Sequence, residues 1–164
     1  MERFWSTGLA ALAAVAVVVG SAAAAPGTAT RTIAFTAAYA GKATTQQTDN
    51  VVAISASGTG KGTLLGAGKI TGKGTADSSV RPCTPFTGPG TMTGTAGTKL
   101  SFKVIPGSKG CGDESGQVFS LVGHATVVSA TGKLKKAKGT LKFTGTYDRS
   151  NGSFNVKFTG KLTQ

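Results

Sequence analysis

Strict alternation of apolar and polar residues near the C-terminus constrains the fold more than any other feature of this sequence. In segment 153–163 every second position holds an apolar or small residue: Phe154, Val156, Phe158, Gly160 and Leu162. A period of two places successive side chains on opposite faces of a strand, one in the core and one in water. Segment 139–147 repeats the pattern, and the intervening 148–152 ends in Asn-Gly, which tolerates the positive φ of tight turns. These two segments are therefore expected to form an antiparallel hairpin.

Further strands are expected along the rest of the chain, because no segment after Val19 shows a helical period. Two segments alternate clearly, 32–39 and 99–104, and 117–128 is expected to be a longer strand with one apolar and one mixed face. Four Gly/Thr-rich segments are strand candidates whose register is weakly specified, namely 51–57, 61–66, 68–75 and 90–96. Segments 76–89 and 106–116 are expected to be loops because of their Pro, Gly, Ser and Asp content.

This pattern predicts an all-β fold of about eight or nine antiparallel strands. Such strands bury one face and dispose of their edges either in a barrel or in a β-sandwich. The frequent strand glycines favour the barrel, because glycine permits the sharp coiling that barrels need. The β-sandwich is the alternative.

Residues 130–145, ATGKLKKAKGTLKFTG, carry a family resemblance. They resemble the Gly-Gly-Thr-Gly-x-Phe-x-x-Ala-x-Gly segment of the dirigent and allene-oxide-cyclase-like barrels, with Ala130 in place of a glycine and Leu134 in place of the aromatic residue. The resemblance implies an eight-stranded antiparallel barrel in which Leu134 and Ala137 tuck under a turn. No position matches a catalytic residue of these families, so the resemblance implies a fold and not an activity. More broadly, the chain resembles small exported bacterial proteins rich in Gly, Thr and Lys, which have no assigned function.

The N-terminus has the pattern of a secretory signal peptide over residues 1–25. Arg3 precedes an apolar run at 9–19, and small residues follow at 21–25. The rest of the chain, 26–164, is expected to be a single all-β domain that is secreted and is either extracellular or associated with the cell envelope. No membrane contact is expected after cleavage, and a retained N-terminal anchor is the alternative.

Two cysteines, Cys83 and Cys111, lie in the exported part of the chain. We expect them to form one disulfide, since an oxidising compartment favours the bond. A reactive or metal-binding thiol is disfavoured, because the chain has one histidine and no Cys-x-x-Cys pair. Neither a metal site nor a cofactor is predicted.

The chain is strongly basic, with 18 Lys and Arg against 6 Asp and Glu, a net charge of +12. Seven lysines form a candidate polyanion surface: Lys133, Lys135, Lys136, Lys138, Lys142, Lys157 and Lys161. An anionic cell-wall or extracellular polymer is the kind of partner that such a surface attracts through charge. The competing interpretation is that these lysines only prevent strand pairing and aggregation. Few aromatics accompany them, so specific nucleic-acid binding is not expected.

Catalytic signals are weak, which favours a non-catalytic protein and leaves an enzymatic role open. The one histidine, His124, has no Gly-x-Ser-x-Gly segment to complement it, and no pair of carboxylates is placed for glycosidase chemistry. The leading hypothesis is an extracellular binding or surface-associated barrel. The alternatives are a polyanion-binding surface protein and a dirigent- or cyclase-like barrel acting on a small apolar ligand in its lumen. Tyr39, His124 and Tyr147 are the candidate lumen contacts for that ligand.

Overall fold

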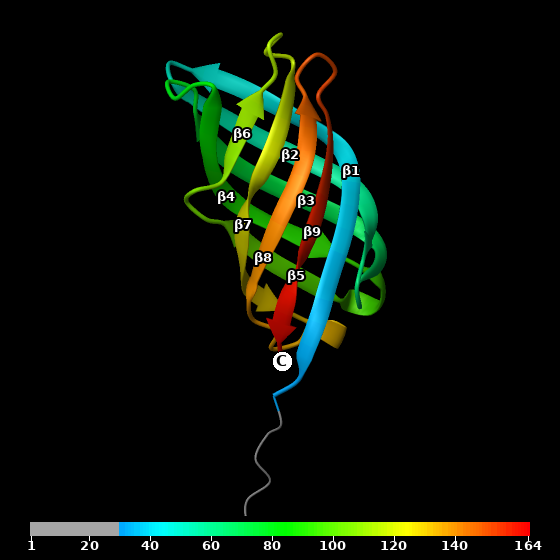
Figure 1. Ribbon diagram of the computed structural model, residues 1–164. Coiled ribbons are helices and arrows are strands. Elements are labelled where there is room, and N and C mark those ends of the chain that lie inside the picture. Colours follow the sequence, from blue (N-terminus) through cyan, green and yellow to red (C-terminus); the bar gives the residue numbers. More distant parts are fainter. Residues whose placement is uncertain (1–29) are drawn as a thin grey trace, which may run out of the picture.

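A computed structural model describes residues 30–164, which form a closed eight-stranded antiparallel β-barrel with one extra strand outside the ring (Figure 1). The prediction of an all-β barrel is confirmed, and the β-sandwich is excluded. The strands are β1 (Thr32–Thr48), β2 (Val51–Gly62), β3 (Gly66–Asp77), β4 (Cys83–Thr93), β5 (Lys99–Val104), β6 (Lys109–Gly112), β7 (Val118–Ala130), β8 (Thr140–Asp148) and β9 (Ser153–Thr163). Two short 3-10 turns, η1 (Thr95–Gly97) and η2 (Gly132–Leu134), lie in connections.

The signal peptide predicted over residues 1–25 lies outside the described residues. Within 30–164, no helix is long and apolar enough to cross a membrane.

The ring runs β1-β2-β3-β4-β5-β7-β8-β9 and closes where β9 pairs with β1. The hairpin predicted from alternation is present: β8 pairs with β9 from Leu141↔Gly160 to Asp148↔Ser153. Its turn ends at Gly152, whose φ of 72° favours glycine. On the inner face, Phe158 and Leu162 are buried as the pattern predicts.

The extra strand β6 comes directly after β5 in the chain and lies between the same two strands as β5, namely β4 and β7. Both strands pair with β4 and with β7. Between Val104 and Lys109 the chain runs five residues, whereas the neighbouring strands advance by three, from Gly88 to Pro85 and from Ala125 to Val122. The segment 105–108 therefore bulges out of the wall. Ser108, which is 1% exposed, links this segment to the neighbouring strand β7. Its Oγ accepts a hydrogen bond from the backbone N–H of His124 over 3.1 Å.

Two loop predictions are partly wrong. Residues 83–89, expected in a loop, belong to β4, and residues 109–112 form β6. Their prolines suggested loops, but Pro89 lies where the β3–β4 ladder has no paired residues between Gly72↔Gly90 and Thr75↔Thr87. A proline, which lacks an N–H, is tolerated in a strand at such an interruption.

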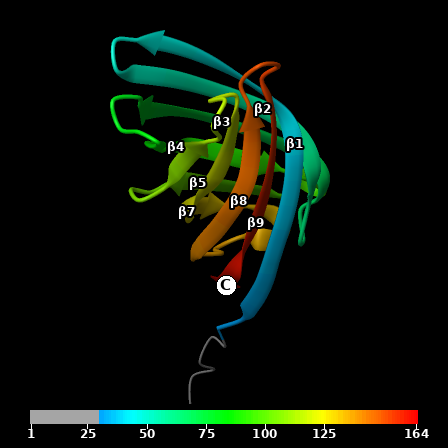
Figure 2. The same ribbon diagram turned by 45° about the horizontal axis from the view of Figure 1, so that its top comes forward.

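The two ends of the barrel differ. At one end β1 begins and β9 ends (Figure 1). This end is filled by buried side chains from the connections, including Leu65, Leu134 and Ala137. The burial of Leu134 and Ala137 matches the expectation that both tuck under the 130–145 turn. We call this the closed end. The other end carries the β1–β2, β3–β4, β6–β7 and β8–β9 connections, and we call it the open end (Figure 2).

Cys83 and Cys111 form the predicted disulfide, with an S–S distance of 2.06 Å. The two residues face each other directly in the β4–β6 ladder. The bond therefore fastens the short strand β6 to the wall at the open end.

Removing the disulfide is expected to cost stability. The double variant Cys83→Ser/Cys111→Ser should lose about 3.5 kcal/mol of unfolding free energy, because the bond closes a loop in the unfolded chain between residues 28 positions apart. Urea unfolding of the variant and the oxidised wild type measures this difference. Reduced wild type is the control and should match the variant. A loss below about 1 kcal/mol would show that the cross-link does not restrict the unfolded chain as this model assumes.

Candidate functional site

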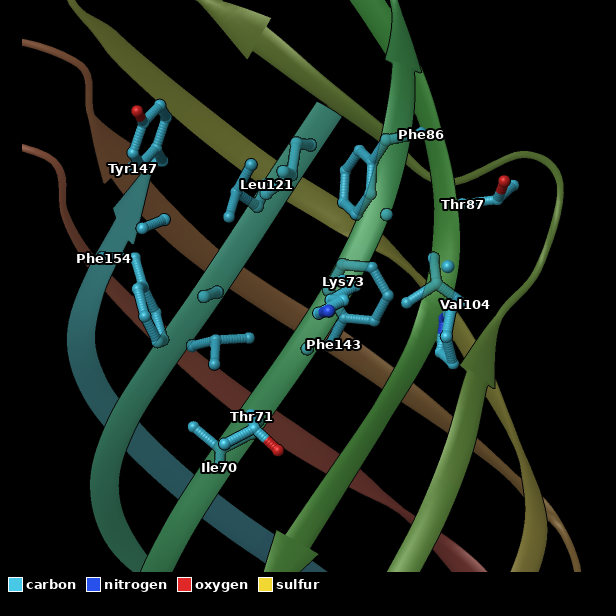
Figure 3. A pocket seen from close by; sticks show the side chains of 18 of the residues that line it. Ile70, Thr71, Lys73, Phe86, Thr87, Val104, Leu121, Phe143, Tyr147 and Phe154 are labelled. Atoms are coloured by element: carbon cyan, nitrogen blue, oxygen red, sulfur yellow. The ribbon is translucent and has the colours of Figure 1, made fainter. Parts of the chain in front are cut away.

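The lumen contains an apolar cavity of about 190 Å3, which we call the cup (Figure 3). Figure 3 shows Phe86, Leu121, Phe143 and Phe154 around the same space, with Tyr147 at one edge of the group. Toward the closed end the cup is bounded by the core, where Met92 and Leu100 are fully buried. The cup is therefore closed toward that end of the barrel.

One wall of the lumen is built from small residues. In register across four neighbouring strands lie Ala43 of β1, Ala56 of β2, Gly72 of β3 and Gly90 of β4. Ala43, Ala56 and Gly72 line the cup. A Cβ added at Gly72 would meet only ordinary contacts, the nearest being 3.6 Å to the carbonyl oxygen of Pro89. The space beside this wall exists because these positions carry almost no side chain.

The facing wall is aromatic. Neighbouring ring centroids are separated by 5.9 Å for Phe86–Phe143, 5.7 Å for Phe143–Phe158 and 5.3 Å for Phe102–Phe158. The rings are tilted against one another, an arrangement that aromatic pairs favour. This contiguous row fixes one wall of the cup, since each ring restrains the next.

A second, more polar cavity of about 570 Å3 lies at the open end, and we call it the mouth. Five residues line both the mouth and the cup: Thr45, Ile54, Phe86, Leu121 and Tyr147. The two spaces are therefore continuous. The remaining polar lining of the mouth is Gln47, Ser78, Arg81, Thr84, Asp113, Ser115, Gln117 and Arg149.

The three candidate lumen residues occupy different places. Tyr147 is half-buried and lines both the cup and the mouth. Tyr39 points inward and is 3% exposed, but it lines neither space. His124 is exposed on the outer face beside Lys142, because in β7 the flanking residues Gly123 and Ala125 take the inward positions. The histidine thus does not face the lumen.

The seven lysines of the candidate polyanion surface are all exposed. Lys133, Lys135, Lys136 and Lys138 cover the closed end, while Lys142, Lys157 and Lys161 lie on the outer faces of β8 and β9. All the acidic residues within 30–164 lie at the opposite, open end: Asp49, Asp77, Asp113, Glu114 and Asp148. The two ends of the barrel therefore differ strongly in charge.

Two acidic residues of the open end, Asp77 and Asp148, stabilise their own turns. Asp77 Oδ1 accepts a hydrogen bond from the backbone N–H of Ser79, and Asp148 Oδ1 accepts one from the backbone N–H of Ser150. Side-chain hydrogen bonds from Ser79 and Ser150 are the largest causes that hold the pKa of these carboxyls below the ordinary value. Among residues 30–164, no group of three His, Cys, Asp or Glu side chains is placed to hold a metal ion.

No protein-family model matches the chain, and no curated protein matches it significantly. The resemblance seen in residues 130–145 is therefore supported at the level of the barrel alone.

Sequence reasoning missed most of the cup. Phe86 lay in a segment expected to be a loop, and Gly72 in a segment whose register was weakly specified. One signal was available: glycines recur with a period of two at 72 and 74, and again at 88 and 90. On paired strands such a spacing leaves one face without side chains.

Tyr39 provides a test of the packing beside the cup. Its hydroxyl is buried without a hydrogen-bond partner among the described residues, and burial raises the pKa of its phenol. Tyr39→Phe removes an unsatisfied polar atom, so the unfolding free energy should rise by about 1 kcal/mol. Urea unfolding measures this change, and Tyr147→Phe at the cup edge is the control. A loss of stability in Tyr39→Phe would show that the hydroxyl is hydrogen-bonded in solution.

Proposed function

We propose that this protein is a non-catalytic binding protein that holds a small, largely apolar molecule in the cup. The observation that carries the proposal is an apolar cavity, bounded by the core toward the closed end and continuous with the open end, inside an otherwise packed barrel. Such concave, mostly apolar pockets are the usual sites of small-molecule binding. The export predicted from residues 1–25 is part of the proposal and places the ligand outside the cell.

The size of the cup limits its ligand. Cavities of about 150 Å3 lined by Leu, Ile and Phe stay dry and bind benzene. At about 190 Å3 the cup accommodates a single ring with a short substituent, or an alkyl group of similar bulk. Longer molecules would extend into the mouth.

The chemistry of the cup supports binding over catalysis. Two titratable residues line the cup: Tyr147 at its edge, and Lys73, which is exposed on β3 (Figure 3). General acid–base catalysis needs a titratable group within hydrogen-bond reach of the reacting atoms. Apart from Tyr147 and Lys73, the large side chains of the cup are hydrocarbon, which suits a carrier or a sequestering protein.

Toluene is a suitable probe for the cup. At ten times its dissociation constant it should stabilise the wild type by about 1.4 kcal/mol, seen as a rise in Tm of several degrees. Gly72→Leu, which puts a side chain into the cup, should abolish this rise, and Ala56→Leu serves as a second filling variant should Gly72→Leu fail to fold. The control is Ser55→Leu on the exposed face of β2. Equal stabilisation of all folded variants would place toluene elsewhere and overturn the proposal.

A second candidate function is polyanion binding by the closed end. It is favoured by the segregation of charge, since four lysines within residues 133–138 extend from an end that carries no acidic residue among 30–164. Their backbone is held in place: the side-chain amide of Gln164 donates to the carbonyls of Lys133 and Lys135 over 3.3 and 2.8 Å. An ordered cluster of cations suits an anionic cell-wall or extracellular polymer.

Heparin binding at rising salt tests this second function. Replacing Lys133, Lys135, Lys136 and Lys138 by Gln should weaken binding at 0.1 M salt by about ten-fold or more and flatten its salt dependence. The matched control, with the same change of charge, replaces Lys42, Lys73, Lys103 and Lys109, which lie away from the closed end, by Gln. If both quadruple variants lose the same affinity, binding reflects net charge and the closed end is not a site.

A further inference from the structure

The distribution of arginine and lysine differs between the mouth and the outer wall. Residues 30–164 contain three arginines, and two of them, Arg81 and Arg149, line the mouth. None of the lysines lines it. Arginine differs from lysine in presenting a planar fork of donors that matches a carboxylate. The mouth therefore carries the cation that is suited to bidentate recognition.

Asp113, the acidic residue that lines the mouth, is already engaged. Asp113 Oδ1 accepts hydrogen bonds from Ser115 Oγ at 2.8 Å and from the backbone N–H of Gln117 at 3.0 Å. These donors, Ser115 first, lower the pKa of Asp113, and neither arginine is among the causes. Within 30–164, neither guanidinium forms a salt bridge. Both arginines are thus available to a ligand.

Both arginines are attached to fixed parts of the wall. Arg81 lies two residues before Cys83, which is disulfide-bonded to Cys111. The backbone N–H of Arg149 donates to the carbonyl oxygen of Gln117 over 2.8 Å, which ties the β8–β9 turn to the β6–β7 connection. The backbone at each arginine is therefore held in place, and the two arginines lie on different connections around the same mouth.

We infer that the ligand is an amphiphile with one carboxylate, its apolar part in the cup and its carboxylate held by Arg81 and Arg149 in the mouth. This inference rests on the proposed function of the cup. The residues shared by both spaces, such as Phe86 and Tyr147, make a single binding path. A monoanion fits better than a phosphate dianion, because the carboxylates of the open end, Asp113 in the mouth among them, repel any further negative charge on the ligand.

Two molecules with the same carbon skeleton test the inference: 3-phenylpropionate and 3-phenyl-1-propanol, each titrated calorimetrically at pH 7. Wild type should bind the carboxylate about ten-fold or more tightly than the alcohol, since charge-assisted bonds to arginine are added. Arg81→Gln/Arg149→Gln should lose this preference and keep its affinity for the alcohol. Arg81→Lys/Arg149→Lys, which keeps the charge and loses the fork, should retain only part of it.

The matched control is Arg31→Gln/Lys142→Gln, which removes the same charge away from the mouth and should retain the full preference. Equal affinity of wild type for the two probes would overturn the carboxylate inference and leave the cup function standing. Tighter binding of 2-phenylethyl phosphate than of 3-phenylpropionate would overturn the choice of a monoanion. If wild type binds neither probe and toluene stabilises Gly72→Leu as well as wild type, the cup function itself fails.

Discussion

Closure of the ring between β1 and β9 is the constraint on which the rest of the structure depends. Once eight strands close, every inward side chain shares one lumen of fixed width, which such a barrel just fills with side chains. Near the closed end, large residues point inward from most strands, and the lumen is solid. Farther along, β1 to β3 contribute Ala43, Ala56 and Gly72, and the aromatic wall alone cannot fill the space. The cup is therefore a consequence of closure combined with uneven side-chain size.

Keeping this space unfilled has an energetic cost. By the scale of cavities made in protein cores, a void of about 190 Å3 forgoes on the order of 4 kcal/mol of packing. The disulfide contributes a similar amount by restricting the unfolded chain, about 3.5 kcal/mol. A small barrel can therefore carry a hollow site and stay folded. Proteins commonly accept such losses of stability where function requires them.

The sequence indicates the packed half of the barrel better than the hollow half. Alternation identified β8 and β9, because large apolar residues such as Phe143 and Phe158 mark the inner face. In β3 and β4 the inner face is marked by glycine, which also marks turns, so the sequence of residues 83–89 indicates a loop. The exposure of His124 follows from its place between two inward-facing residues of β7. The arginines of the mouth come together only through two connections far apart in sequence, a juxtaposition that no local pattern contains.

The opposite charges of the two barrel ends give the molecule a permanent dipole along the barrel axis, in addition to its net charge. Near a negatively charged surface, such a dipole experiences a torque within roughly the Debye length, about 10 Å at 0.1 M salt. The barrel would rotate before it touches, so that the lysine-covered end faces the surface and the open end faces the solvent. Most encounters with the surface would then take place through the closed end. A barrel held in this way would keep its mouth accessible to molecules that diffuse past.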